Sequence, residues 1–398
     1  MKAASIIVAV CALVFADLSA AMADDDDAPR FPQNATFTTQ AITPLAIEGL
    51  TGDAAGNLYT TGRATPPTEC PVWKITGASL TIVGLVPNPA ASPCNPSGIT
   101  FDRFGNLYIS DAASGGVVWT LAPNATMPPT ADPFATGVPG TNGLAFDRDG
   151  NLWTGDGTTG QGRVWRIAPT GGTCEPSFSG CKEVLRIQRM ANSANVGRQA
   201  STLQPVVAAN PQPLVANGVA FNRHGDLFIA DTARGAIWKA EFDHSGNLKS
   251  RTKCDTTFPD NTLCLDNIFV AHTYLEGADG IALDRAGNIW VAANERNAII
   301  MVTRKGRVIE IFRNPVNATG LRNSADTPAG NSRILEFPTS PFLSGTRFCT
   351  SQSDGDRRDN SPRAAGEINA GNSAPVARGK ISCMDEELGI PGMPLPVQ

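Results

Sequence analysis

The stretch DGIALDRAGNIW at residues 279–290 decides the fold, because four other stretches of the chain repeat it. Each copy joins a polar residue, a glycine, a short apolar run, a turn containing a second glycine, and another run that ends in an aromatic residue. The other copies are EGLTGDAAGNLY at 48–59, SGITFDRFGNLY at 97–108, NGLAFDRDGNLW at 142–153 and NGVAFNRHGDLF at 217–228. Two short apolar runs around a glycine turn predict a β-hairpin in every copy.

Further strand-like runs follow the hairpins, including Val117 to Leu121, Val164 to Ile167, Ala236 to Phe242 and Ala298 to Val302. Four short strands per unit of about 40–50 residues are typical of the blades of a β-propeller. The copies start 45 to 75 residues apart, and the two longest spacings predict insertions near 168–212 and 243–275. Insertions of this kind lie in surface loops, where they can shape a site.

The fold class that we predict is all-β: a six-bladed propeller of four-stranded antiparallel blades, with seven blades as the alternative. Residues 335–350 are interpreted as a degenerate sixth hairpin, and Gly379 to Met384 as a later strand of the same blade. A ring of blades has to close, and the strand-like segment Thr36 to Ile47 is placed to pair with the last blade. We therefore expect both ends of the chain to share one sheet within a single domain, 36–398.

The first 23 residues are predicted to be a secretory signal peptide. Lys2 precedes an uncharged stretch from Ala3 to Ala16, and Ala21-Met22-Ala23 supplies a cleavage site of small residues. The apolar run is shorter than the roughly 20 residues needed to span a bilayer. Residues 24–35 are interpreted as a flexible acidic leader, and the protein is expected to be secreted or periplasmic.

Cysteine usage agrees with export into an oxidising compartment. The chain has 9 cysteines, and removal of Cys11 with the signal peptide leaves an even number, which indicates disulfides. Pairing of neighbours along the chain would join Cys70 with Cys94, Cys174 with Cys181, Cys254 with Cys264 and Cys349 with Cys383. The pattern alone leaves other pairings open. A zinc site built from these cysteines is the weaker interpretation, since no C-x-x-C pair occurs.

The overall charge and the known motifs exclude several classes of function. A formal net charge of −5 gives no electrostatic reason to bind nucleic acid or an anionic membrane. No G-x-S-x-G elbow, phosphate-binding loop or H-E-x-x-H motif occurs. We therefore expect a small-molecule partner, and neither nucleic acid nor a membrane.

The first residue of each repeat is the position that we predict to form a shared binding site. In a propeller the innermost strand of each blade lines the central channel, so equivalent residues of all blades converge around its mouth. The residues at this position are Glu48, Ser97, Asn142, Asn217 and Asp279. Two carboxylates and two amides provide a ring of hard oxygen donors, which suits calcium, magnesium or manganese, with zinc as a further alternative.

Local turn chemistry is the competing interpretation, because Asn and Asp before a glycine are common turn formers. It does not explain Glu48, and each repeat already has a turn five to nine residues further on. His272 lies seven residues before Asp279, close enough to reach the mouth, and is a candidate for substrate binding. Asp231 follows the second strand of its blade, but aspartates at the same place in two other blades dilute that signal.

The repeats resemble those of the gluconolactonase and regucalcin (senescence marker protein) family of six-bladed propellers. The likeness is carried by Glu48-Gly49, Asn142-Gly143, Asn217-Gly218 and Asp279-Gly280, each followed by an apolar strand and a D-x-x-G-N type turn. FPTSPFLSG at 337–345 and GMPLP at 392–396 resemble the last blade and the ending of that family. The repeats match those of NHL-type propellers, many of which are binding modules, about equally well.

The resemblance implies one divalent cation, most simply calcium, held by Glu48, Asn142, Asn217 and Asp279. It also implies hydrolysis of lactones or related esters, with Asp279 as the general acid or base. Ser97 falls outside this ligand set and is expected to form a wall of the substrate pocket.

Specificity and class of function stay open at this point. Family members that act on sugar lactones carry an Arg two residues before the first Asn, where this chain has Gly140, so sugar-lactone specificity is in question. A non-catalytic propeller that binds a ligand or a protein at its mouth is the main alternative. A propeller lyase or synthase is a third interpretation, which no specific residue of the sequence supports.

Overall fold

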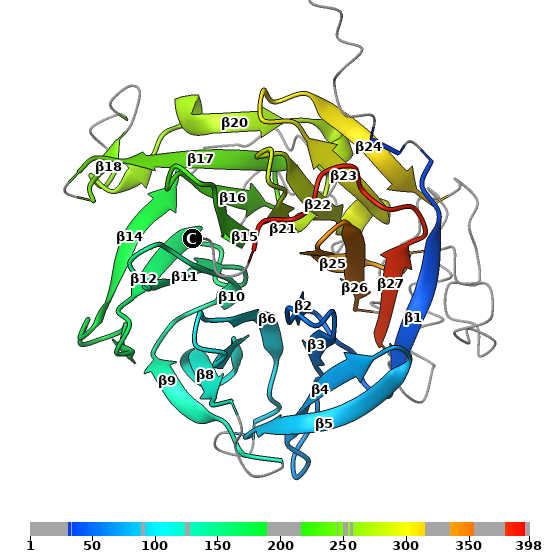
Figure 1. The fold of residues 1–398 in the computed structure, drawn as a ribbon. Helices are drawn as coiled ribbons and strands as arrows, with labels where there is room; N and C mark the ends of the chain where they lie inside the picture. The colour runs from blue at the N-terminus through cyan, green and yellow to red at the C-terminus, as the bar shows by residue number, and fades with distance from the viewer. Residues whose placement is uncertain are drawn as a thin grey trace, which may run out of the picture. The chain divides into compact units, whose positions relative to one another are not determined.

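The computed structural model describes residues 31–32, 34–88, 92–123, 128–188, 216–244, 246–249, 254, 258–314, 335–353 and 379–394, all within the compact unit Phe31–Gln398. Six β-sheets follow one another around a central axis (Figure 1). In these residues the helical segments are short 3-10 turns, and none of them could cross a membrane. The predicted all-β, six-bladed propeller is confirmed. The signal peptide and most of the leader lie outside the described residues.

The first three blades form in chain order, from the innermost strand outward. Blade 1 contains β2 (Thr51–Gly52), β3 (Leu58–Thr61), β4 (Cys70–Thr76) and β5 (Ser79–Val86). Blade 2 contains β6 (Pro96–Phe101), β7 (Leu107–Asp111), β8 (Val117–Leu121) and β9 (Asp132–Thr136). Blade 3 contains β10 (Thr141–Phe146), β11 (Leu152–Asp156), β12 (Arg163–Ile167) and β14 (Cys181–Ile187).

The last three blades depart more from this pattern. Blade 4 contains β15 (Ala216–Phe221), β16 (Leu227–Asp231) and β17 (Ala236–Phe242), and its outer position is divided between β18 (Leu248–Lys249) and β20 (Ile268–Ala271). Blade 5 contains β21 (Ala278–Leu283), β22 (Ile289–Ala293), β23 (Ala298–Val302) and β24 (Val308–Arg313). Blade 6 contains β25 (Pro338–Ser344), β26 (Arg347–Gln352), β27 (Gly379–Met384) and β1 (Phe37–Thr43).

The two long spacings between repeats also supply short extra strands. In the first, β13 (Gly172–Thr173) pairs in parallel with β9 of the preceding blade. In the second, β19 (Thr262–Leu263) pairs in parallel with the end of β14. The described part of each inserted region therefore ties one blade to its neighbour.

One hydrogen-bonded turn repeats at the predicted hairpins. Oδ1 of Asp284 accepts from the backbone N–H groups of Ala286 and Asn288, while Oδ2 accepts from Asn288 Nδ2 (2.8 Å) and the indole of Trp290 (3.3 Å). Equivalent sets are made by Asp53, Asp102 and Asp147. Burial, followed by the charge of Asp102, raises the pKa of Tyr108 to about 12, so its phenol stays a donor. These turn residues are scaffold.

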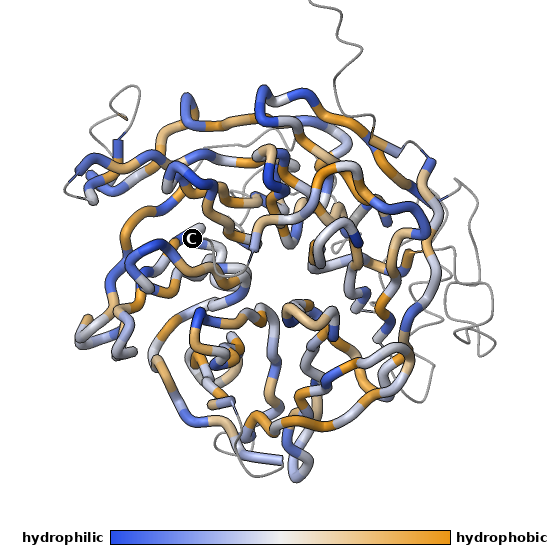
Figure 2. Tube along the Cα trace, in the orientation of Figure 1, coloured by the Kyte–Doolittle hydropathy of each residue, from blue (hydrophilic) through white to orange (hydrophobic). Residues whose placement is uncertain are grey.

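Apolar side chains fill the interfaces between neighbouring blades. Six clusters of buried side chains occur in the described residues, and each joins two successive blades, including the sixth and the first. Trp165, Trp238 and Trp290 are the largest fully buried side chains. Figure 2 shows apolar residues spread along the strands, with hydrophilic residues gathered at the turns. Since apolar burial contributes about 25 cal/mol per Å², these interfaces hold the ring together.

Both ends of the chain contribute to blade 6, which closes the ring. The outermost strand, β1, pairs antiparallel with β27, with Thr38 opposite Cys383. The predicted pairing of the N-terminal strand with the last blade is therefore confirmed. The structure also has the disulfides between sequence neighbours: Cys70–Cys94, Cys174–Cys181, Cys254–Cys264 and Cys349–Cys383.

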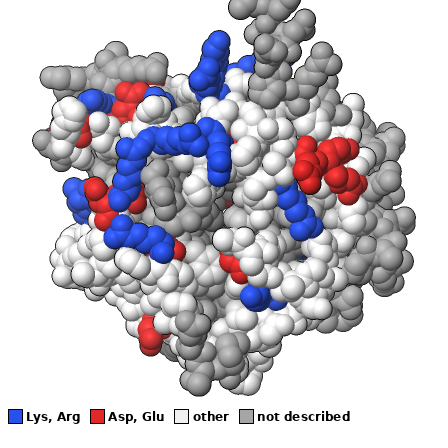
Figure 3. Space-filling view, viewed as in Figure 1, with Lys and Arg blue, Asp and Glu red and all other residues white. Residues whose placement is uncertain are grey.

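The segment after β27 crosses one end of the central channel. Gly392 pairs with Asp284, and the N–H of Met393 donates to the carbonyl oxygen of Leu283 (3.0 Å). In Figure 1 this segment is the red trace that runs from β27 across the front of the ring. Met393 lines a cavity of about 110 Å³ that is walled by the six innermost strands. Figure 3 views the same face, where an arc of Lys and Arg side chains lies along one side of the centre of the ring.

Candidate functional site at the channel mouth

The first residues of the repeats lie at the other end of the channel, which we call the mouth, where the innermost strands begin. The glycines that follow them let adjacent blades meet backbone to backbone. A methyl group on Gly218 would lie 2.5 Å from the carbonyl oxygen of Asp279, and one on Gly98 would lie 2.2 Å from that of Asn142. Similar approaches, of 2.1, 2.9 and 2.5 Å, join Gly49 to Ser97, Gly143 to Asn217 and Gly280 to Thr339. Only glycine fits at these positions.

The approach of Gly280 identifies Thr339 as the sixth member of the mouth, which the degenerate sixth repeat concealed in the sequence. Thr339 Oγ1 donates to the carbonyl oxygen of Glu48 (2.7 Å), and so does Ser351 Oγ. Blade 6 thereby meets blade 1. The first positions of adjacent blades are, in order, Glu48, Ser97, Asn142, Asn217, Asp279 and Thr339.

A β-bulge interrupts the innermost strand at the same place in five blades. The register shifts fall between Pro96 and Ile99, Thr141 and Leu144, Ala216 and Val219, Ala278 and Ile281, and Pro338 and Ser340. A bulge leaves a residue out of the ladder and re-aims its side chain, and here it includes the first position of the repeat. The bulge frees backbone groups from the ladder, and a hydroxyl of the adjacent blade can bond to them. Ser110 Oγ of β7 donates to the carbonyl oxygen of Asn142 in β10 (2.6 Å).

A second polar position adjoins the first at the mouth, and sequence reasoning missed it. It follows the second strand of each blade and lies 15 residues after the first position in blades 1 to 5. Asn217 Nδ2 donates to Thr232 Oγ1 (3.1 Å), and Asn294 Nδ2 donates to Asp279 Oδ2 (2.9 Å). The constant spacing between the two members of each pair is the signal that would have found this position.

The second position differs in character around the ring. In blade 1 it holds Arg63, which forms an ion pair with Glu48; their side chains are 32% and 13% exposed. In blades 2 and 3 it holds Ala112 and Gly157, and a methyl group on Gly157 would lie 2.5 Å from Nδ2 of Asn142. Polar partner side chains therefore adjoin the first position on blades 1, 4 and 5, and small residues do so on blades 2 and 3.

The donor chemistry of the mouth fits a hard divalent cation. Asn217 and Asp279 are only 7% and 4% exposed, so these two side chains have little access to bulk water. Because Nδ2 of Asn217 donates to Thr232, Oδ1 is the atom that this amide can offer to a cation. Within the described ranges no group of three or more His, Cys, Asp and Glu side chains is arranged so that it could hold a metal ion by itself. A cation here would therefore need the amide oxygens as well as the carboxylates.

The two candidates for substrate binding have different surroundings. Ser97 is 5% exposed, and its carbonyl oxygen is the one that Gly49 approaches. His272 begins the connection from β20 to β21: its Nδ1 accepts from the backbone N–H of Tyr274 (3.0 Å), and the two rings pack edge to face. These contacts of His272 shape its own connection at the mouth end, and its role in substrate binding stays a prediction.

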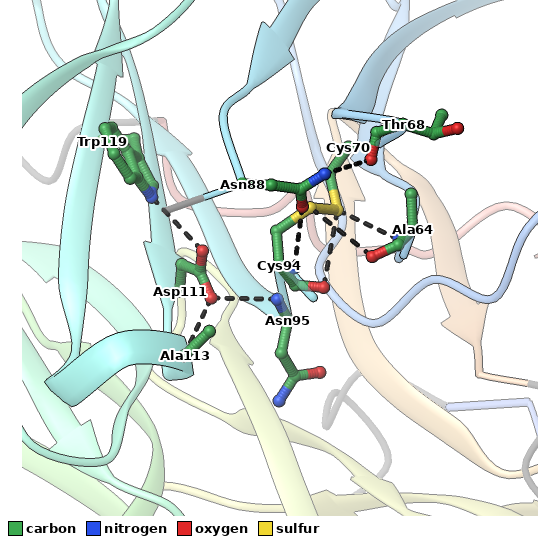
Figure 4. The surroundings of a disulfide bond; sticks show 9 residues. All are labelled: Ala64, Thr68, Cys70, Asn88, Cys94, Asn95, Asp111, Ala113 and Trp119. Atoms are coloured by element: carbon green, nitrogen blue, oxygen red, sulfur yellow. Dashed lines mark hydrogen bonds between the residues drawn. A yellow bond between two sulfur atoms is a disulfide. The ribbon is translucent and has the colours of Figure 1, made fainter. Parts of the chain in front are cut away.

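The aspartates at the ends of the second strands serve the fold, and the residue after each of them occupies the second mouth position. Asp231 is fully buried, and its Oδ2 accepts from Arg234 (2.8 Å) and from the indole of Trp238 (3.1 Å). Figure 4 shows the equivalent Asp111 accepting from two backbone N–H groups and an indole, near the Cys70–Cys94 disulfide. Asp231, which the sequence indicated as a candidate, is therefore the immediate neighbour of the mouth residue Thr232.

The fold and the mouth together define a class: a six-bladed β-propeller with an oxygen-rich polar site at one end of its channel. The family model for the SMP-30/Gluconolactonase/LRE-like region matches residues 186–321, which include Asn217 and Asp279. This match confirms the family resemblance that the repeats indicated.

Solved structures share this architecture. The calcium-binding protein regucalcin from Agrobacterium tumefaciens is 15% identical, with a TM-score of 0.54 over 92% of this chain and 98% of that one. A gluconolactonase from Xanthomonas campestris is 12% identical, with a TM-score of 0.50 over 90% and 94%. The PQQ-bound aldose sugar dehydrogenase of Streptomyces coelicolor is 14% identical, with a TM-score of 0.52 over 89% and 100%. Such low identities show the shared fold alone. No curated protein matches the chain by sequence.

Proposed function

We propose that this protein is a divalent-metal-dependent hydrolase of lactones or related esters, with its reactive centre at the mouth. The observation that carries the proposal is that Glu48, Asn142, Asn217 and Asp279 lie at equivalent positions of one ring. Asp279 is 4% exposed, and its carboxylate accepts a hydrogen bond from Asn294. Likeness to a calcium-binding regucalcin and to a gluconolactonase supports this class of activity, as does the family model.

The chemistry of the proposed reaction follows from these side chains. Glu48, Asn142, Asn217 and Asp279 would hold the cation, and its charge would polarise a carbonyl group and stabilise negative charge on the carbonyl oxygen. Asp279 acts as the general base that takes a proton from the attacking water. The hydrogen bond from Asn294 orients the carboxylate of Asp279 before the water arrives. Burial of Asn217 and Asp279 strengthens the electrostatic interactions that these side chains make.

We further propose that the substrate is a small molecule and that the protein works outside the cytoplasm. The four disulfides are consistent with an oxidising compartment, in which such bonds persist. The signal peptide that would direct export remains a prediction from the sequence.

Removal of divalent cations is expected to abolish hydrolysis. The purified protein would be assayed by pH-stat on a panel of aliphatic and aromatic lactones and esters, before and after EDTA treatment, with its metal content measured by mass spectrometry. We expect activity to disappear and to return with added Ca²⁺, since the cation would supply the charge that polarises the substrate carbonyl. EDTA already saturated with calcium is the control. Metal binding without turnover of any compound would identify a non-catalytic binding module instead.

Arg63→Gln is expected to tighten the binding of Ca²⁺ by about tenfold. The guanidinium pairs with Glu48, and a fixed positive charge beside a ligand disfavours a second cation. Titration calorimetry with CaCl₂ measures the change, and Arg103→Gln, at the opposite end of the channel, is the matched loss of charge. Unchanged or weaker binding would show that Arg63 supports the site by holding Glu48 in place.

A further inference from the structure

Asn294 is a buried polar residue of the mouth that contacts Asp279. It follows β22 as the first residue of a 3-10 turn, Asn294–Arg296, and is 4% exposed. Its backbone N–H donates to the carbonyl oxygen of Gly277 (2.9 Å), and its Nδ2 donates to Asp279 Oδ2 (2.9 Å). Its Oδ1 is buried and has no hydrogen-bond partner among the described residues. A buried carbonyl-type oxygen without a donor or a cation is costly, and native structures rarely leave one.

The same position in the neighbouring blade is satisfied within the protein. Thr232 accepts from Asn217 and donates to the carbonyl oxygen of Ala278 (2.7 Å). Exchanging the oxygen and the nitrogen of the Asn294 amide would not give the amide oxygen a donor, because the oxygen would then face the carboxylate of Asp279. The orientation of the amide is therefore set by Asp279, and Oδ1 requires a partner that the described chain does not supply.

Oδ1 of Asn294 lies close enough to the carboxylate of Asp279 for both to bind one cation. The two polar atoms of one amide are close together, so Oδ1 lies within about 5 Å of the Asp279 carboxylate that Nδ2 contacts. Calcium takes oxygen ligands at about 2.3–2.6 Å and can therefore bridge two oxygens up to about 5 Å apart. Calcium also accepts six to eight ligands, which leaves room for another amide oxygen beside the four already named.

We propose that Oδ1 of Asn294 is a fifth protein ligand of the cation, next to Glu48, Asn142, Asn217 and Asp279. This inference rests on the proposed cation site and adds a residue to it. A site with five protein oxygens favours Ca²⁺ over Mg²⁺, which prefers octahedral geometry and keeps several of its waters.

Terbium luminescence tests the assignment, because its lifetimes in H₂O and D₂O count the water molecules on the ion. The full chain and its Asn294→Ala, Asn294→Asp and Thr232→Ala variants would be loaded with Tb³⁺ as a substitute for Ca²⁺, after circular dichroism has shown that each is folded. We expect Asn294→Ala to bind Tb³⁺ 10- to 100-fold more weakly and to carry one additional bound water. Asn294→Asp, which keeps an oxygen, should retain the wild-type water count and bind at least as tightly.

Thr232→Ala is the matched control, since it removes only a side chain that contacts a ligand. It should lower affinity without adding a bound water. An unchanged water count in Asn294→Ala, with Asn294→Asp equally impaired, would overturn the assignment and leave Asn294 as a residue that positions Asp279. A Tb³⁺ site with the expected water counts in a protein that hydrolyses nothing would support Asn294 as a ligand and count only against the hydrolase. A wild-type chain that binds no Tb³⁺ would overturn the assignment together with the cation site.

Discussion

Asp279→Asn is expected to lower kcat for the hydrolysis of any lactone substrate by about 10³-fold or more. The substitution keeps the size of the side chain and an oxygen for the cation, but an amide cannot take a proton from water. The measurement is kcat at saturating Ca²⁺, so that a weaker affinity for the cation does not contribute to the loss.

Two controls accompany this variant. Asp149→Asn makes the same chemical change at an exposed turn on the opposite end of the channel and should leave kcat unchanged. The urea midpoint of Asp279→Asn, measured without divalent cation, should stay near that of the wild type, since the amide oxygen can then accept from Asn294. Activity of Asp279→Asn within twofold of the wild type would remove Asp279 from the mechanism.

Gly218→Ala is expected to lower the free energy of unfolding by about 3 kcal/mol, as overpacking of a rigid contact does. Its new methyl group would lie 2.5 Å from the carbonyl oxygen of Asp279 and 2.8 Å from the Cα of Gly280. Both atoms are backbone of the next blade, so the clash cannot be relieved by turning a side chain. Urea unfolding followed by tryptophan fluorescence measures the loss.

Gly389→Ala is the matched control for this prediction. Its methyl group would meet nothing within 4 Å, and its backbone is not in the left-handed region, so stability should hardly change. Equal unfolding midpoints for the two variants would show that the blades can separate enough to accept a side chain. The close approach at Gly218 would then not be what fixes the spacing of the mouth.

Local sequence pattern was sufficient to predict the blades. Each hairpin depends on residues close in sequence, such as Asp284, Asn288 and Trp290, whose spacing is the same in the other copies. Closure of the ring could be predicted as well, because a propeller with an unpaired strand at each end has one way to satisfy both. The disulfide pairing could not, since nothing in the spacing of cysteines selects neighbours.

The mouth could be predicted only in part. The first position stood out because its residue type varies within a constant frame, from Glu48 to Asp279. The second position includes Ala112 and Gly157 among its members, so it shows no common chemistry until the structure places Arg63 beside Glu48. Thr339 was concealed for a different reason, because blade 6 has serine where the other blades have the glycine that marks the repeat.

The shared blade has a consequence for how the chain becomes folded. A hydrogen bond from Thr36 to Asp385 spans a sequence separation of 349 residues, and β1 has its ladder partner in β27, near the other end of the chain. The first strand to be synthesised must therefore wait for nearly the last. Contacts of such high sequence separation form slowly, so the ring cannot close on a nascent chain before its final blade has emerged. Until then β1 has an unpaired edge, which is open to pairing with another chain during synthesis.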